Sequence, residues 1–132
     1  MSPSLAGRVV ERSSGMAFEK TVESVLGMIE RAGMQVFARI DHAAAARAVG
    51  LEMPATLVLL YGNPAKGTPL MLAAPEAALE LPLRVLVREA APGGDVLVSY
   101  RPVGPELQEL GVPGELAATL EPAQRLLLQH LG

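Results

Sequence analysis

The residues of this sequence that could do chemistry gather first in one short segment of glycines with a lysine between them. Gly62 and Gly67 have the glycine spacing of a phosphate-binding P-loop. That motif requires a lysine directly after the second glycine, but Thr68 stands there and Lys66 comes too early. The segment therefore does not predict nucleotide hydrolysis.

A weaker interpretation of the same segment is a site for a small anion. Asn63 is a good helix N-cap and Pro64 a good first helical residue, so we expect a helix to begin there. Backbone N–H groups at a helix start, with Lys66 beside them, would favour a carboxylate or a phosphate. The alternative is that Asn63 and Thr68 only cap helices, and the sequence leaves both open.

Asp41 and His42 form the second candidate group, at a predicted junction between a strand and a helix. A histidine near a helix start can serve as a general base, so one hypothesis is an enzyme of unknown reaction that uses His42. The other is that Asp41 caps the helix and His42 is an ordinary first-turn residue. The second of the two histidines, His130, stands near the end of the sequence. This spacing predicts no metal site, and we assign no catalytic residue.

Composition narrows the remaining classes of function. The absence of cysteine excludes disulfides, thiol catalysis and thiolate metal sites. The absence of tryptophan, with only two Phe and two Tyr, argues against a base-stacking nucleic-acid surface, and a net charge of −3 gives no general attraction to nucleic acid or acidic membranes. We find neither the apolar core of a signal peptide nor a run long enough to span a membrane. We therefore expect a cytoplasmic protein without a cofactor.

The elements that must position these residues follow from the hydrophobic pattern. Apolar residues recur at helical spacing from Phe18 to Arg31, whereas the run from Ala55 to Tyr61 is typical of a buried central strand. Further strands are predicted over three ranges: Met34–Asp41, Leu83–Glu89 and Val96–Arg101. The pattern predicts one α+β domain over residues 1–132, with an antiparallel-rich sheet packed on one side by helices and with residues 1–5 flexible.

Alternation along these strands predicts which side chains point away from the helices. If Val36, Ala38 and Ile40 face the helices, the opposite face carries Gln35, Phe37, Arg39, Arg84, Leu86, Arg88, Leu97, Ser99 and Arg101. A first strand would add Arg8, Val10 and Arg12. Six of the nine arginines would then share one face of the sheet.

Three roles for such a face remain open at this level. It can be a solvated surface on which arginine stems cover apolar neighbours. It can be the interface of a symmetric homodimer, with arginines pairing acids at the rim. It can also bind an anion or a nucleic-acid duplex, for which the arginines and an analogy of fold are the support.

Several runs along the chain resemble the DUF302 family: Phe18–Val22, Ile40–His42, Tyr61–Pro64, Gly67–Met71, Leu81–Leu83 and Val98–Tyr100. The resemblance covers about residues 6–131. It implies a compact α/β domain similar to the TATA-binding-protein fold, a homodimer, and no agreed catalytic residues. The family often has an asparagine where Arg101 precedes Pro102, so this chain departs from the pattern there.

Together these observations predict a homodimeric module that binds a small molecule or an anion, or that assists a partner, rather than an enzyme. We expect its pocket between the segment Asn63–Thr68 and the strand end that carries Asp41 and His42. Lys66 would supply a polar contact. Neither a membrane nor a nucleic acid is an expected partner.

Overall fold

The computed structural model describes residues 8–129 and 131. Residues 1–5, which were expected to be flexible, and His130 lie outside this part. The strands are β1 (Val10–Ser13), β2 (Gln35–Asp41), β3 (Thr56–Gly62), β4 (Leu83–Glu89) and β5 (Val96–Tyr100). The α-helices are α1 (Phe18–Arg31), α2 (His42–Ala48), α3 (Pro64–Ala73), α4 (Val103–Glu109), α5 (Gly114–Ala117) and α6 (Glu121–Gln129). Two 3₁₀ helices, η1 (Pro75–Leu79) and η2 (Ala118–Leu120), complete the described elements.

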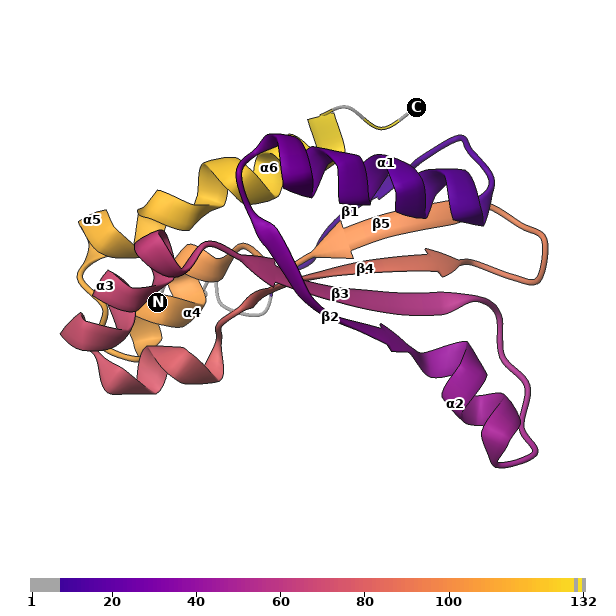
Figure 1. The fold of residues 1–132 in the computed structure, drawn as a ribbon, viewed down its shortest axis with the longest axis horizontal. Helices are drawn as coiled ribbons and strands as arrows, with labels where there is room; N and C mark the ends of the chain where they lie inside the picture. Colours follow the sequence, from indigo (N-terminus) through magenta and orange to yellow (C-terminus); the bar gives the residue numbers. More distant parts are fainter. Residues whose placement is uncertain (1–7, 130, 132) are drawn as a thin grey trace, which may run out of the picture.

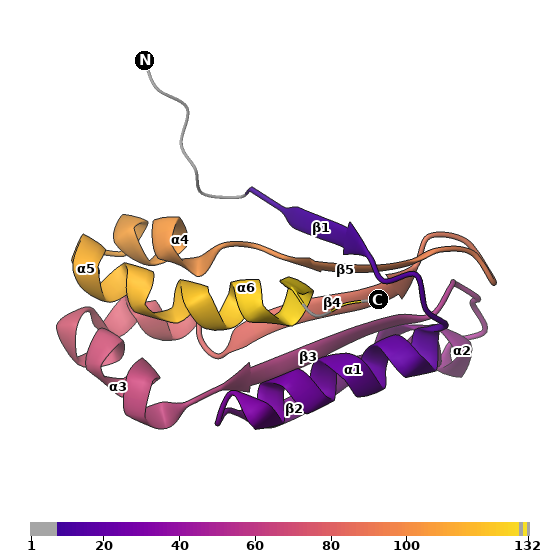
Figure 2. The same cartoon turned by 90° about the horizontal axis from the view of Figure 1, so that it is seen from above.

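The five strands form one antiparallel sheet in the order β1-β5-β4-β3-β2. Helices α1 and α6 lie side by side along one face of this sheet, as Figures 1 and 2 show. The remaining helices other than α2 gather at one end of the sheet, and α2 projects from the other end (Figure 1). The predicted α+β domain, with helices on one side of an antiparallel sheet, is confirmed.

The helical face of the sheet holds the core. Val85 and Val87 of β4 are almost completely buried, as the alternation predicts, and so is Leu59 of the central strand β3. Helix α1 places Val25 and Ile29 against them because both lie on its apolar stripe. Gly33, at φ +75°, ends this helix in a conformation that favours glycine. The apolar stripe of α1 and the predicted facing of β4 are therefore confirmed.

The predicted facing of β2 is wrong for most of the strand, because the strand contains a bulge. Val36 pairs with Tyr61 and Ala38 with Leu60, so Phe37 is an extra residue. Alternation resumes one position out of phase. Arg39 therefore lies opposite Leu59 on the helical face, whereas Ala38 and Ile40 lie on the opposite face.

The predicted facing of β1 is also wrong. Val10 pairs with Tyr100 and Arg12 with Val98, both of which belong to the helical face. Arg12 confirms this orientation, since its Nη1 donates a hydrogen bond to the Leu128 carbonyl of α6 at 2.9 Å. Arg8, two residues before Val10, is displaced from the predicted face by the same alternation. It is Glu11, opposite Ser99, that lies on the other side.

The sheet face away from α1 and α6, which we call the open face, is therefore less basic than predicted. Arg84 and Arg88 lie on it, and Arg101 contributes to the same surface. Two acids accompany them: Arg84 lies 3.7 Å from Glu80, and Arg88 lies 3.3 Å from Glu11. These pairs are partly exposed and each is worth at most about 1 kcal/mol. They nevertheless neutralise two of the three arginines that remain on this face.

Candidate functional site

A cavity of about 320 Å³ opens at the end of the sheet where β2 and β3 meet α3, η2 and α6. This volume falls within the range of pockets that hold small organic ligands. Its wall is predominantly apolar and is formed by Ala32, Met34, Phe37, Met71, Ala78, Leu81, Pro82, Leu83, Leu120 and Ala123. The polar side chains in it are Asn63, Lys66, Thr68 and Thr119. We call this hollow the Lys66 cavity.

Helix α3 brings three of these polar residues to the cavity. The helix begins at Pro64, and the Asn63 Oδ1 accepts a hydrogen bond from the Ala65 N–H at 2.9 Å. The predicted capping by Asn63 is confirmed. The carbonyl oxygen of the amide is used in this way, and among the described residues the two N–H donors of the Asn63 side chain have no partner.

The start of α3 does not offer the free backbone N–H groups that were expected to hold an anion. Pro64 has no N–H, and that of Ala65 is taken by the cap. The N–H groups of Lys66 and Gly67 both donate to the Asn63 carbonyl at 2.9 Å. The backbone site for an anion was therefore predicted wrongly, because a proline and a self-capping asparagine leave these donors satisfied.

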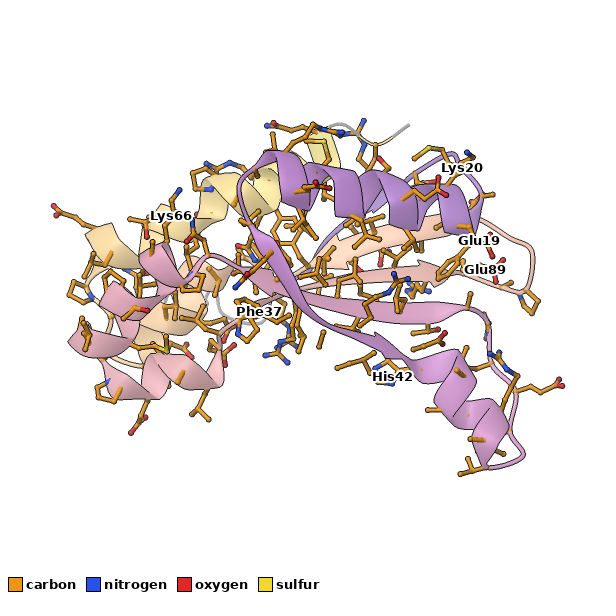
Figure 3. All side chains as sticks on the ribbon, viewed as in Figure 1. Glu19, Lys20, Phe37, His42, Lys66 and Glu89 are labelled. Atoms are coloured by element: carbon orange, nitrogen blue, oxygen red, sulfur yellow. The ribbon has the colours of Figure 1, made fainter. Side chains whose placement is uncertain are left out.

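Lys66 remains as the charged group of the cavity. It has no ion pair within residues 8–129 and 131, and none of the described residues that line the cavity is acidic. Figure 3 shows Lys66 at the end of the molecule where α3 and α6 meet. An unpaired ammonium beside an apolar hollow favours a ligand that has a negative group and an apolar body.

Phe37 lies at the edge of the same cavity because of the bulge in β2. A Cβ atom at Gly62 would lie 3.4 Å from the Cε2 atom of Phe37, so the ring rests against the end of β3 where there is no side chain. Phe37 is 48% exposed, so part of this residue remains accessible to a ligand. Phe37 was predicted to lie on the open face, and its place in the cavity was not foreseen.

The structure does not bring Asp41 and His42 to this cavity, so the expected single pocket is wrong. Gln35 lies opposite Gly62, but Asp41 lies opposite Leu57, at the other end of β3. Gly62 and Leu57 are five residues apart on β3, so about 17 Å of strand separates the two positions. Figure 3 shows His42 well apart from Lys66 along the molecule.

Asp41 and His42 have a clear local role where they lie. The Asp41 Oδ1 accepts a hydrogen bond from the Ala44 N–H at 2.9 Å, which confirms Asp41 as the N-cap of α2. His42 lines a shallow hollow on the open face whose other described residues include no carboxylate: Ile40, Val58, Leu60, Leu79, Leu81, Pro82 and Arg84. Within the described residues, no three His, Cys, Asp or Glu side chains are placed to hold a metal ion.

The apolar half of the Lys66 cavity could not be read from the sequence. Leu120 and Ala123 come from η2 and α6, more than fifty residues after Lys66, and belong to patterns that predict only an ordinary helix. Met34 and Ala32 enter from the turn after α1. Asn63, Lys66 and Thr68 were found because capping residues and a lysine share one short segment.

The fold is shared with a solved structure, the crystal structure of an uncharacterized conserved DUF302 protein from Bacillus stearothermophilus. The two structures superpose with a TM-score of 0.86, covering 96% of this chain and 100% of that chain. Their sequences are 15% identical, so the likeness establishes the fold alone.

Curated relatives resemble part of the chain. The proteins named fluoride-specific ion channel FluC 1 from Brucella suis biovar 1 (strain 1330) and from Brucella abortus biovar 1 (strain 9-941) are each 40% identical over 74 residues. These residues are 56% of this chain but only 29% and 27% of those proteins, so the chain spans less than a third of their length. In the part of the chain that the structure describes, no helix combines the length and the apolar character needed to cross a bilayer.

A family model covers nearly all of the described fold. The model described as "Domain of unknown function DUF302" matches residues 10–127, which extend from the first residue of β1 into the last turns of α6. The capped start of α3, the five-stranded sheet and the Lys66 cavity all fall within the match. The chain belongs to the DUF302 family.

Proposed function

We propose that this protein is a binding module for a small, mainly apolar molecule that carries one anionic group. The observation that carries the proposal is the Lys66 cavity, where a lysine with no ion pair among the described residues stands beside an apolar wall whose described residues include no acid. The channel named in the curated relatives is not part of the proposal, because the chain matches only 27–29% of those proteins.

The two halves of the cavity would recognise the two ends of such a ligand. Met34, Phe37 and Met71 offer flexible or aromatic surface to the apolar body. The Lys66 ammonium and the Asn63 amide would donate hydrogen bonds to a carboxylate, sulfonate or phosphate oxygen. Thr68 adds a hydroxyl that has no partner among the described residues.

Binding is the function that this arrangement supports best. The described residues that line the cavity include no histidine, cysteine or carboxylate, which are the usual general bases and nucleophiles. His42, the candidate base of the rival enzyme hypothesis, lies at the other end of β2. In the hollow that holds it, no described acid orients the imidazole.

The test uses two fluorescent probes that differ in one charged group. 1-Anilinonaphthalene-8-sulfonate carries a sulfonate, whereas N-phenyl-1-naphthylamine has a similar apolar body and is neutral. We expect the native protein to bind both, with Lys66→Gln weakening the sulfonate probe by about threefold to tenfold and leaving the neutral probe unchanged. Fluorescence titration of each variant measures the two dissociation constants.

The second lysine of the chain provides a matched control. Lys20 lies on α1 and pairs with Glu23, far from the cavity, as Figure 3 shows. Lys20→Gln removes the same charge as Lys66→Gln. Because Lys20 lies far from the cavity, this substitution should leave the binding of both probes unchanged. Equal weakening of sulfonate-probe binding by the two substitutions would mean that only net charge matters.

A second variant, Ala123→Phe, should fill the cavity and weaken the binding of both probes. Unchanged binding in that variant would refute the site.

The natural ligand is sought in the protein as it is purified. Native mass spectrometry of protein prepared without added ligand should show a reproducible extra mass that disappears in Ala123→Phe.

We also propose that the module acts as a homodimer. The open face offers less for this role than expected, because Glu80 and Glu11 already pair with two of its arginines.

A further inference from the structure

Strand β2 forms one edge of the sheet and presents its backbone to solvent. Among the described strands it pairs with β3 alone, and six of its seven residues are exposed. At the opposite edge, β1 is shorter, with four residues. An exposed edge strand is a template for pairing with another strand, because one row of its N–H and C=O groups has no partner in the sheet.

The bulge leaves the second half of β2 regular. From Ala38 to Asp41 the pairing with β3 is continuous. Arg39 and Asp41 point to the helical face of the sheet, and Ile40 points to the open face. Ile40 is 40% exposed, and Arg39 has no ion pair within residues 8–129 and 131. This part of the edge therefore presents a cation, an apolar side chain and an anion in succession.

This order of side chains is complementary to itself in one antiparallel register. If Ile40 lies opposite Ile40 of a second copy, each Arg39 lies opposite the other copy's Asp41 on the same face. Centring the pair on Arg39 would instead oppose two arginines, and centring it on Asp41 would oppose two aspartates. A two-fold axis normal to the sheet allows only registers centred on a residue, since other registers would mix the two faces.

We propose that two copies of this chain pair along β2, antiparallel, with the two-fold axis at Ile40. The two sheets then become one sheet of ten strands, with the helices of both copies on the same side. Two Arg39–Asp41 ion pairs form across the interface, and the two Ile40 side chains meet on the open face. Asp41 keeps its cap to α2, because that hydrogen bond uses Oδ1 and leaves Oδ2 for the arginine.

The same pairing accounts for a second feature of this edge. His42 and Ile40 line the shallow hollow on the open face. In the proposed register Ala38 of each copy lies opposite His42 of the other, so the second copy covers the open side of the hollow.

An interface formed by two strand edges buries less surface than a standard interface. We therefore expect a dimer that dissociates as the protein is diluted through the micromolar range.

The first test exchanges the charges. Arg39→Asp gives a copy with aspartate at positions 39 and 41, and Asp41→Arg gives a copy with arginine at both. Each variant alone should form dimers at least about tenfold more weakly than the native chain, because like charges would then face each other. An equimolar mixture should form heterodimers, since both cross-pairs are again opposite in charge. Sedimentation equilibrium over a dilution series measures all of these.

The outcomes separate this interface from its rivals. Dimers that survive in Arg39→Asp but dissociate in the double variant Arg84→Glu and Arg88→Glu would place the interface on the open face and overturn the proposal. A native chain that is monomeric throughout would also overturn it, and would leave the edge for a strand of another protein. Circular dichroism checks that Asp41→Arg, which loses a helix cap, remains folded.

The second test uses the absence of cysteine from the chain. Ile40→Cys should form a disulfide between two copies on mild oxidation, because opposite Cβ atoms in an antiparallel pair lie about 5 Å apart. Val49→Cys is the matched control, since this side chain is 73% exposed but lies beyond α2. Equal cross-linking of the two variants would show random collision and refute the register.

Discussion

Tyr61 is 0% exposed, and its buried hydroxyl has no hydrogen-bond partner among the described residues. A buried polar group without a partner costs about 1–3 kcal/mol. Burial, with a smaller contribution from the nearby Tyr100, raises the pKa of the Tyr61 hydroxyl above its ordinary value of 10.0. Both effects concern one oxygen atom in the buried core.

Tyr61→Phe should therefore stabilise the protein. We expect the free energy of unfolding at neutral pH to rise by about 1 kcal/mol, measured by urea denaturation. Above pH 10 the unfolded native chain releases the tyrosine proton while the folded chain keeps it. The native protein should then lose up to about 1.4 kcal/mol per pH unit more than the variant. Destabilisation by Tyr61→Phe would show instead that the hydroxyl has a partner.

At the scale of single residues, the sequence identified capping residues more reliably than ligand-binding residues. Asn63 and Asp41 accept the hydrogen bonds expected of N-caps, because capping depends only on a few neighbouring positions. Assigning Asp41 and His42 to the Lys66 cavity required the distance along β2, which depends on the direction and register of its pairing with β3. Neither is contained in the local pattern.

Among the elements, α1 contains a glycine whose replacement tests how much the helix gains from a residue that favours it. Gly27 lies inside this helix, and a Cβ atom there would meet only the flexible end of Arg31, at 3.3 Å. Gly27→Ala should raise the free energy of unfolding by about 0.5–1 kcal/mol, because alanine favours the helix and has less freedom when unfolded.

Gly33 provides the opposite control on the same helix. Its φ of +75° is accessible to glycine but strained for alanine, although the surrounding space is open. Gly33→Ala should therefore lower the free energy of unfolding by about 1 kcal/mol. Equal effects of the two substitutions, measured by thermal unfolding, would contradict this account of where α1 ends.

The regularity of the hydrophobic pattern explains which elements could be predicted. α1, β4 and β5 follow hydrophobic periods that hold over their whole lengths, so their facing was predicted correctly. β3 was recognised as a central strand by its continuous apolar run. β2 and β1 are edge strands with exposed side chains, and exposure removes the pattern that would fix their phase. A bulge adds one residue without any signature in the types of Val36, Phe37 and Ala38.

For the whole molecule, pairing through β2 couples stability to concentration. A dimer that forms only from folded copies makes the midpoint of thermal unfolding rise as the protein is concentrated. We expect this rise for the native chain and a constant midpoint for Arg39→Asp, measured by calorimetry over a hundredfold range of concentration. Constant midpoints in both would indicate that no dimer contributes to stability.

The two proposed sites lie on different parts of the molecule and can fail separately. The Lys66 cavity depends on α3, η2 and α6, whereas the β2 interface depends on Arg39, Ile40 and Asp41. Phe37, which lines the cavity from within β2, is the residue that joins them. A ligand that moved this ring would alter the start of the edge strand as well.

The bulge at Phe37 shifts the alternation of side chains along β2 by one residue. Every residue after it is displayed on the face opposite to the one that its position would otherwise select. Because Val36 and Ala38 already pair with the adjacent residues Tyr61 and Leu60, removing Phe37 would leave a regular strand in which Arg39 stays on the helical face and Ile40 on the open face. A deletion of this one residue would thus preserve the contents of both surfaces and remove only the ring at the edge of the Lys66 cavity.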